Sequence, residues 1–389
     1  ALPVIYLAGS SRNRGINTMW KKIVAAFAVL VSACAAPEDS PSETLDGRFT
    51  PGSTIDFTFQ SDGNTLSGIF DTPATDDSKA LILFVHGYGP SNIRERNSYA
   101  DLRQRFNQIG IATAVWDKPG QGQSEGTFDI NQSVQSSADE VLNAVKSLRD
   151  ANAPGSDKIG IWGISRAGWI APLALSQDPG IEFWISVSGT TAEDNFAYLL
   201  LSNLPYEGGT EAQAAQYAEE WRTGCELFRT GAPFERYQAA TESLRADEYI
   251  LQQRGAWQTR AQYEAQQKSC DAGSCPRIDN DMCSYTFIED FDPMLSQLDV
   301  DTLAIFGEKD LNIDWRKTRR FYLETLGQNP NATLEIASFE DADHNLNVSE
   351  TGSIREMQSM TGPQKSEGYY DVQIDWLEST VLGRDDAEE

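Results

Sequence analysis

The sequence is poor in histidine and in positive charge. Its 389 residues include two histidines, His86 and His344, and 31 lysines and arginines against 58 aspartates and glutamates. Two histidines do not suffice for a histidine-rich metal centre, and a reaction that needs an imidazole base must use one of them. The formal net charge of -27 at pH 7 disfavours nucleic acids and anionic membrane surfaces as binding partners. Such acidity otherwise serves solubility.

The chain also lacks an apolar stretch of the length that a membrane-spanning helix needs. Residues 23–31 are apolar and follow Met19-Trp-Lys-Lys22, which is the basic-then-apolar pattern of a secretory signal peptide. The stretch ends in Val31-Ser-Ala-Cys34, which resembles a bacterial lipobox. That resemblance implies cleavage before Cys34 and lipid on its thiol and amino group. A signal peptide without lipidation is the alternative.

The predicted signal defines the N-terminal boundaries. If Met19 starts the natural chain, residues 1–18 are a tag or an over-long start, and residues 19–33 are the lipoprotein signal peptide. Residues 34–50 are small, polar and proline-containing, which predicts a flexible tether. Ala35, rather than aspartate, follows the lipidated position, and by resemblance to bacterial sorting rules this implies the outer membrane. We therefore expect an exported lipoprotein that faces the periplasm or the cell surface.

Cysteine is scarce as well. Besides Cys34 the chain has four, Cys225, Cys270, Cys275 and Cys283. An even number of cysteines in an exported chain predicts two disulfides, with three possible connectivities. A zinc site of four thiolates is the alternative, but the spacing lacks the paired Cys-x2-Cys of such sites.

Apolar runs and helical patterns alternate along most of the chain. Strands are predicted at residues 80–85, 111–116, 159–162, 183–188, 302–306 and 333–338, and the continuous apolar run at 80–85 is typical of a strand buried on both faces. Helical spacing is found at residues 98–109, 131–149 and 169–176, and a hairpin is predicted from residues 55–59 and 65–70. This alternation predicts an α/β fold with a mostly parallel, doubly wound sheet and helices on both faces.

A serine stands at the apex of a tight turn between a predicted strand and a predicted helix. The turn is Gly163-Ile-Ser-Arg-Ala-Gly168, and a strand, a turn with Ser165 and a helix form the nucleophile-elbow pattern. Gly163 allows the sharp turn, and the following helix directs its N-terminal N–H groups at the serine. Ala167 stands where this pattern usually has glycine, and glycine follows as Gly168. An ordinary strand-to-helix turn is the alternative for this stretch alone.

An acid and a base follow two later strands. Asp310 comes just after the strand at residues 302–306, at the sheet edge where such folds place their sites, with Glu308 and Asp314 as rivals in the same loop. His344 follows the last predicted strand. A serine hydrolase needs a base that titrates near neutral pH, for which histidine is the usual choice.

Five motifs together carry a family resemblance. In order they are His86-Gly87 at a strand end, Asp-x-x-Gly-x-Gly-x-Ser at residues 117–124, the elbow, Gly307-x-x-Asp310 and Asp343-His344. This set resembles the α/β-hydrolase superfamily, and within it the bacterial serine-esterase and lysophospholipase-like, serine aminopeptidase-type branch. The resemblance covers about residues 55–382, apart from an insertion.

The resemblance assigns roles to these residues. It implies Ser165 as nucleophile, Asp310 as orienting acid and His344 as base, in the chain order that distinguishes this superfamily. It implies an oxyanion hole formed by the N–H groups of Arg166 and Tyr88. The resemblance gives four further residues structural roles in the oxyanion loop and the elbow: His86, Gly87, Gly163 and Gly168.

The insertion is predicted to be a helical cap. We expect the catalytic domain over residues 51–190 and 297–389 and the cap, with four cysteines, over residues 191–296, with helices at 210–229, 234–244 and 248–268. A cap in this position shapes the substrate pocket and limits water. Its aromatic residues either line that pocket or, as we favour, form the cap's own core: Tyr198, Tyr217, Trp221, Tyr237, Trp257 and Tyr263.

The sequence as a whole predicts a serine esterase that cleaves small carboxylic esters through an acyl-enzyme on Ser165. The chemistry needs no metal and no organic cofactor. We expect no nucleic acid and no obligate protein partner, and a membrane only through the lipid on Cys34. The alternatives are a peptidase, amidase or thioesterase on the same three residues, and an inactive lipid-anchored binding protein.

Overall fold

The computed structural model of the chain describes residues 49–384 except 76–77, 97, 131, 192–193, 255, 272–287 and 289. The predicted signal peptide, Cys34, most of the predicted tether, Cys275 and Cys283 lie outside the described residues. Within the described ranges, no helix combines the length and the apolar character needed to cross a membrane.

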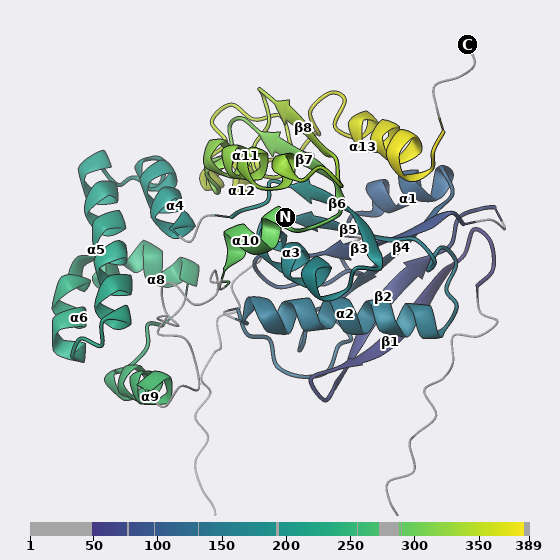
Figure 1. Cartoon of the computed structure of the whole chain (residues 1–389). Coiled ribbons are helices and arrows are strands. Elements are labelled where there is room, and N and C mark those ends of the chain that lie inside the picture. The colour runs from purple at the N-terminus through teal and green to yellow at the C-terminus, as the bar shows by residue number, and fades with distance from the viewer. Residues whose placement is uncertain are drawn as a thin grey trace, which may run out of the picture. The chain divides into compact units, whose positions relative to one another are not determined.

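The described residues form an eight-stranded sheet in the order β1-β2-β4-β3-β5-β6-β7-β8 (Figure 1). Its strands are β1 (Thr54–Ser61), β2 (Asn64–Asp71), β3 (Ala80–Val85), β4 (Ile111–Trp116), β5 (Ile159–Ile164), β6 (Ile181–Val187), β7 (Asp301–Gly307) and β8 (Leu334–Phe339). β1 pairs antiparallel with β2, and β2 with β4, whereas all other neighbours are parallel. The predicted mostly parallel sheet is therefore confirmed.

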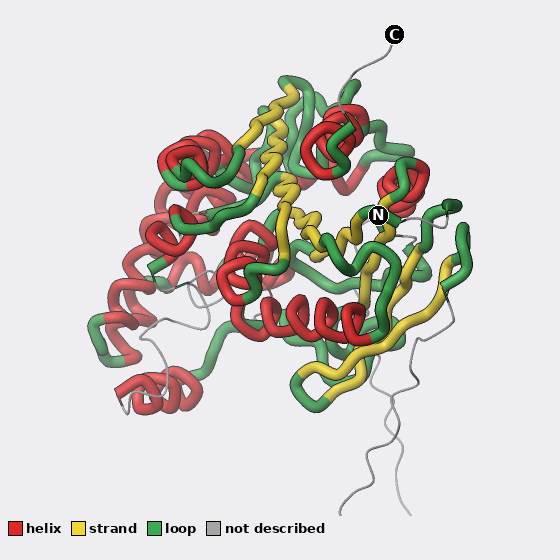
Figure 2. The backbone as a smooth tube through the Cα atoms, turned by 45° about the vertical axis from the view of Figure 1, so that its right-hand side comes forward, coloured by secondary structure: helices red, strands yellow, loops and turns green. Residues whose placement is uncertain are grey.

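Helices cover both faces of the sheet (Figure 2). One face packs against α2 (Val134–Asp150), α3 (Ala167–Gln177), α10 (Phe291–Ser296) and α11 (Trp315–Glu324). The other face packs against α1 (Ala100–Gln108) and α13 (Asp371–Trp376), which continues into a π-helical turn, η4 (Leu377–Val381). The shorter elements η3 (Leu326–Gln328) and α12 (Ile354–Ser359) precede and follow β8. The doubly wound arrangement places every parallel strand between two apolar layers.

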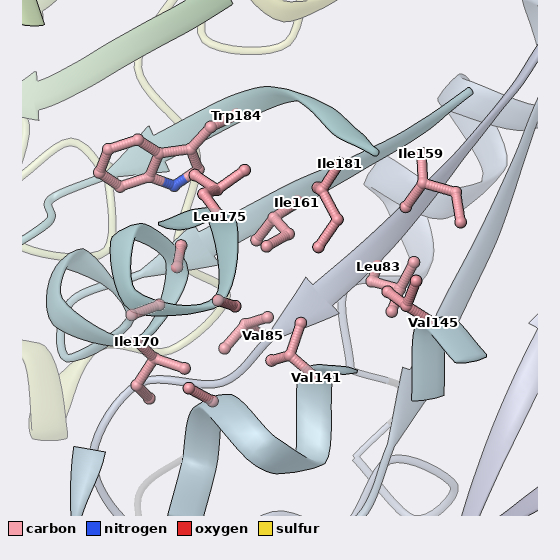
Figure 3. Packing of buried hydrophobic residues seen from close by; sticks show 14 of the residues in the cluster. Leu83, Val85, Val141, Val145, Ile159, Ile161, Ile170, Leu175, Ile181 and Trp184 are labelled. Atoms are coloured by element: carbon pink, nitrogen blue, oxygen red, sulfur yellow. The ribbon is translucent and has the colours of Figure 1, made fainter. Parts of the chain in front are cut away.

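The core on the face covered by α2 and α3 shows how apolar strand residues hold these helices on the sheet. In Figure 3, Val141 and Val145 of α2 lie over Leu83 and Val85 of β3, and Ile170 of α3 belongs to the same cluster. All of these side chains are less than 5% exposed. Burying one such side chain contributes about 1.5–3 kcal/mol, so this layer fixes α2 and α3 on the sheet.

A helical insertion lies between β6 and β7, as predicted. It contains α4 (Asn195–Asn203), η1 (Leu204–Glu207), α5 (Glu211–Arg229), α6 (Phe234–Ala240), α7 (Glu242–Ala246), α8 (Glu248–Arg254), α9 (Arg260–Asp271) and the first-face helix α10. The insertion has its own hydrophobic cluster, and Tyr217, Trp221, Tyr237 and Tyr263 are buried in it. These four aromatic residues therefore form the core of the insertion.

Two helices predicted in the insertion are each divided into two shorter helices in the structure. The predicted helix at 248–268 is interrupted, and α9 begins after Thr259. There the Thr259 N–H donates to Oε1 of Gln262 at 2.8 Å, while the Gln262 N–H donates to Oγ1 of Thr259 at 3.4 Å. This reciprocal pair is a capping box, which starts a new helix where periodicity alone predicts continuation. The predicted helix at 234–244 is likewise divided, between α6 and α7 at Thr241.

Two of the four insertion cysteines are among the described residues. Cys225 and Cys270 are disulfide-bonded. The connectivity of the four cysteines stays a prediction, because Cys275 and Cys283 lie outside the described residues.

Candidate active site

Ser165 stands immediately after β5 in a left-handed backbone conformation, with φ of +59°. A residue with a side chain pays about 1–3 kcal/mol for such a conformation, so neighbouring bonds must hold it. Its N–H donates to the Val187 carbonyl at 3.0 Å, and its own carbonyl accepts from Gly168 at 2.9 Å and Thr190 at 3.2 Å. The end of β6 and the start of α3 thus fix the serine at the apex of the predicted elbow.

The departure at Ala167 has a steric explanation. Ala167 is fully buried, and a methyl group added at Gly163 would lie 2.6 Å from its Cβ. A methyl group at Gly168 would lie 2.5 Å from the backbone nitrogen of Thr190. The Ala167 methyl therefore occupies the space that a side chain at 163 would need, and Gly168 allows the segment after β6 to approach α3.

Asp310 and His344 are joined by a hydrogen bond. Nδ1 of His344 lies 2.8 Å from Oδ2 of Asp310, and the carboxylate must be the acceptor. Oδ1 of Asp310 accepts from the N–H groups of Asn312 at 2.7 Å and Ile313 at 3.0 Å, so the carboxylate is fixed by its own loop. Of the rival acids, Asp314 caps α11 by accepting from the Lys317 N–H at 3.0 Å. The structure thus brings Asp310, and not Asp314, to the histidine.

The electrostatics of His344 favour its protonated form. Burial lowers the pKa of His344, but the Asp310 charge and hydrogen bond, together with the Asp343 charge, outweigh burial and raise the pKa above its usual value. Among the described residues, neither Nε2 of His344 nor Oγ of Ser165 has a protein hydrogen-bond partner. Catalytic hydrogen bonds in unliganded sites are often long and form only with substrate. The arrangement can therefore accept a proton at Nε2 while Nδ1 stays bound to Asp310.

His86 has both ring nitrogens engaged. Nε2 donates to the Trp116 carbonyl at 2.7 Å, which leaves Nδ1 to accept from the Tyr99 hydroxyl at 3.1 Å. Burial, followed by the Lys118 charge, lowers the pKa of His86 to about 4. The ring is neutral at physiological pH and holds the end of β3 against the end of β4, which is a structural role.

The loop after β3 lies directly against the nucleophile. A methyl group added at Gly87 would lie 3.1 Å from Cβ of Ser165 and 3.1 Å from the Ile164 carbonyl oxygen. We call residues 86–91 the oxyanion loop. Its backbone includes Tyr88, so the structure places this predicted donor in the loop that contacts the elbow.

Lys118, which sequence reasoning passed over, joins this loop to the one after β4. Its Nζ donates to the carbonyl oxygens of Gly87 at 2.6 Å and Gly89 at 2.7 Å, and its backbone N–H donates to Oγ of Ser91 at 2.8 Å. Burial, followed by repulsion from Arg166, lowers the pKa of Lys118 to about 7. In the sequence, only its place inside the motif at residues 117–124 could have indicated that Lys118 belongs to the site.

A buried acid lies close to these two cations. Glu140 of α2 is 5% exposed and accepts from Nε1 of Trp116 at 3.3 Å and from Nε2 of Gln132 at 2.5 Å. Burial raises the pKa of Glu140, while Lys118 and Arg166 act in the opposite direction. The guanidinium of Arg166 donates to Oγ of Ser137 at 3.0 Å and to the Gln132 carbonyl. The side chain of Arg166 thus bonds to α2 and the residues just before it. The predicted role in the oxyanion hole belongs to the backbone N–H of Arg166 and not to this side chain.

The first helix of the insertion holds the loop that contains Asp310, which we call the acid loop (residues 310–313). The Tyr198 hydroxyl donates to the Asp310 carbonyl at 2.9 Å, and Asn195 Nδ2 donates to the Asn312 carbonyl at 2.9 Å. Between them, Ser202 and Asn203 both donate to the Leu311 carbonyl at 2.6 Å. Tyr198 is therefore a support of the acid loop. Periodicity does not reveal such side-chain contacts, and α4 itself was not predicted.

The sequence matches the family model described as "Serine aminopeptidase, S33" over residues 76–347. No curated protein sequence matches the chain. Among solved structures, DcsB in complex with a substrate analogue is similar, with a TM-score of 0.52 and 16% identity over 85% of this chain and 100% of that chain.

Two further similar structures are an esterase, Pf2001, from Pyrococcus furiosus and Est1E from Butyrivibrio proteoclasticus with bound ferulic acid. Pf2001 has a TM-score of 0.47 and 15% identity over 86% of this chain and 94% of that chain. Est1E has a TM-score of 0.46 and 15% identity over 84% of this chain and 98% of that chain. At such identities a structural likeness concerns the fold alone.

The family match decides the classification. It spans more than half of the 389-residue chain and includes the elbow, the acid loop and His344. The fold has the strand order, the elbow and the helical insertion described above. The chain therefore belongs to the serine aminopeptidase S33 family of α/β hydrolases.

Proposed function

We propose that this protein is a serine esterase that hydrolyses carboxylic esters of small molecules through an acyl-enzyme on Ser165. The observation that carries the proposal is the 2.8 Å hydrogen bond between His344 Nδ1 and Asp310 Oδ2, at the sheet edge that also holds Ser165 in its left-handed turn. A nucleophile, a base and an acid that orients the base are the three roles of serine hydrolysis.

In the first half of the reaction, Oγ of Ser165 attacks the ester carbonyl while Nε2 of His344 takes the hydroxyl proton. The carbonyl oxygen becomes an oxyanion, which the N–H groups of Arg166 and Tyr88 stabilise. Losing one such donor typically costs about 10²–10³ in rate. His344 then gives its proton to the departing alcohol, and the acyl group remains on Ser165.

In the second half, His344 takes a proton from a water molecule that attacks the acyl-enzyme. The second tetrahedral intermediate uses the same two N–H groups, and His344 returns the proton to Ser165 Oγ as the acid product leaves. Asp310 keeps Nδ1 protonated throughout and stabilises the imidazolium. Every proton transfer uses this chain's own residues and water, so the scheme requires no cofactor.

An amidase or peptidase is the second candidate, because the matched family is described as a serine aminopeptidase. An amine is a poorer leaving group than an alcohol, so amide cleavage depends more strongly on protonation by His344. Rates on a matched ester and amide with the same acyl group distinguish the two. A thioester with that acyl group tests the thioesterase alternative in the same series.

The decisive test uses purified wild type and Ser165→Ala. We expect the wild type to hydrolyse p-nitrophenyl esters and to be labelled by a fluorophosphonate, and the variant to do neither. Ser188→Ala replaces a buried serine just after β6 and is a matched control that keeps Ser165. Equal turnover by Ser165→Ala would refute the proposal, and measurable ligand binding without any labelling of the wild type would favour a binding protein.

We further propose that the protein is exported and anchored by lipid on Cys34, facing the periplasm or the cell surface. The support is the basic and apolar stretch before Cys34 and the even number of insertion cysteines. Radiolabelled palmitate fed to bacteria that express the full chain should be incorporated into the wild type but not into Cys34→Ser. Equal labelling of both would refute the anchor without affecting the proposed reaction.

A further inference from the structure

Lys118 is held in a single place by both its backbone and its side chain. The residue is 9% exposed, its N–H is bonded to Ser91, and the preceding carboxylate of Asp117 accepts from the Ile93 N–H at 2.8 Å. From this anchored position the ammonium reaches two carbonyl oxygens of the oxyanion loop, those of Gly87 and Gly89. Hydrogen bonds from a charged donor are about twice as strong as neutral ones.

The bond to Gly87 fixes the direction of the next N–H. The peptide between Gly87 and Tyr88 is trans, so its C=O and N–H point in opposite directions. With the carbonyl of Gly87 bonded to Lys118, the N–H of Tyr88 points away from the lysine. Gly87 meanwhile contacts the elbow so closely that a methyl group would lie 3.1 Å from Cβ of Ser165. The peptide therefore lies beside the nucleophile in a defined orientation.

The loop itself does not enforce this orientation. Gly87 and Gly89 flank Tyr88, and Gly89 has a φ of +96°, which only glycine adopts readily. Two glycines make rotation of the intervening peptides easy. A rotated Gly87–Tyr88 peptide would turn its N–H toward the ammonium and its carbonyl oxygen toward the reacting centre, where that oxygen would repel an oxyanion.

We infer that Lys118 is a positioning residue of the oxyanion hole, which holds the Gly87–Tyr88 peptide so that the Tyr88 N–H serves the transition state. The inference rests on the proposed serine hydrolase reaction. Lys118 does not touch the substrate. It stabilises one of two orientations of a flexible peptide, so its effect is felt when the oxyanion forms and not when the substrate binds.

The test compares the wild type with Lys118→Met, which keeps the length of the side chain and removes both hydrogen bonds. We expect kcat on a p-nitrophenyl ester to fall about tenfold to a hundredfold, below the full cost of losing a donor, while KM stays nearly constant. A trifluoromethyl ketone, which forms a hemiketal oxyanion with Ser165, should lose affinity by the same factor. The corresponding methyl ketone, which does not form this adduct readily, should bind equally well to both proteins.

Lys158→Met is the matched control. Nζ of Lys158 also donates to a backbone carbonyl, that of Val381 at 2.6 Å, but Lys158 precedes β5 and so lies at the opposite edge of the sheet. This variant should keep wild-type kcat and wild-type affinity for both ketones. Lys118→Gln retains a shorter donor and should fall between the wild type and Lys118→Met.

The outcomes separate the inference from the proposed function. If the wild type reacts through Ser165 and Lys118→Met keeps its kcat and ketone affinity, the inference is wrong. It is equally wrong if both ketones lose affinity by one factor or if only KM changes. Should Lys118→Met fail to fold by circular dichroism, Lys118→Gln decides by the same criteria. If Ser165→Ala is as active as the wild type, the proposed function itself fails.

Discussion

The side-chain amide of Asn203 connects the acid loop to the segment after His344. Its Nδ2 donates to the Leu311 carbonyl at 2.6 Å, and its Oδ1 accepts from the Ile354 N–H at 2.8 Å. Asn203 is 1% exposed, so both bonds are shielded from solvent. One residue at the end of α4 thus joins two segments that follow different strands of the sheet.

Asn203→Ala should therefore weaken both the fold and the reaction. Ser202 still donates to the Leu311 carbonyl, but the Ile354 N–H loses its acceptor, which costs about 1–3 kcal/mol, and we expect the free energy of unfolding to fall by that amount. The kcat should fall as well, because the acid loop positions Asp310. Urea unfolding and ester hydrolysis measure the two effects. The control is Asn331→Ala. Asn331 is exposed and its side-chain amide donates to Asp299, so its loss should change the free energy of unfolding by less than about 0.5 kcal/mol. Equal stabilities of the two variants would contradict the prediction.

Gly163 and Ala167 should show strong coupling in a double-mutant cycle. Gly163→Ala places a methyl group 2.6 Å from Cβ of Ala167, and such overpacking costs about 1–3 kcal/mol. In an Ala167→Gly background the space is free, so the same substitution should cost much less. Thermal unfolding of the four proteins gives the coupling energy. An equal cost in both backgrounds would show that the contact with Ala167 does not require glycine at 163.

Asp310 and Asp314 are four residues apart, yet substitution by asparagine should lower kcat at Asp310 and leave it nearly unchanged at Asp314. Asp310→Asn removes the charge that holds the His344 tautomer, and we expect kcat to fall by about 10⁴. Asp314→Asn leaves a residue that caps a helix nearly as well, so kcat should stay close to the wild type. Steady-state kinetics on one ester is sufficient. A comparable loss in both variants would argue for general damage to the loop.

The pH profile should show an acid limb that belongs to His344. The base must be neutral to accept the serine proton, so activity is lost as the pH falls through its pKa, which is raised above 6.5. The pKa of His86 is lowered to about 4, so His86 does not titrate in the same range. The prediction is an acid limb in kcat/KM with a midpoint above 6.5.

Because the chain has two histidines, their titrations can be measured directly by proton NMR. One imidazole resonance should move with a midpoint above 6.5 and the other should stay constant down to about pH 5. His86→Gln, which retains an amide donor for the Trp116 carbonyl, assigns the two signals. Activity that is constant from pH 8 to pH 4 would contradict the role of His344.

The sequence is sufficient to predict which site residues come together at the ends of the strands. Each predicted strand of the parallel sheet overlaps an observed strand, and parallel strands bring their carboxyl ends to one edge. Ser165, Asp310 and His344 follow β5, β7 and β8, so their convergence is a consequence of topology. The Asp310–His344 bond was thereby predictable, as was the doubly wound fold that positions it.

The contacts that support the site were not predictable in this way. Lys118 is bonded to Gly87, 31 residues away, and Asn203 to Leu311, 108 residues away, and in both cases a side chain meets a loop carbonyl. Periodicity describes apolar faces and does not indicate which polar side chain reaches which backbone group. Ala167 was identified from the sequence as a departure, but its steric partner, Gly163, follows from the coordinates alone.

The hydrogen bonds of α4 also set a limit for exchanging the insertion between relatives. Hydrogen bonds join the insertion to the acid loop and to α12, and they come from residues of α4 and η1: Asn195, Tyr198, Ser202, Asn203 and Tyr206. A chimera that replaces the chain from α5 to α9 keeps these bonds, whereas one that begins at α4 removes them. The useful fusion boundary therefore lies near Gly208, inside the insertion, and not at the end of β6.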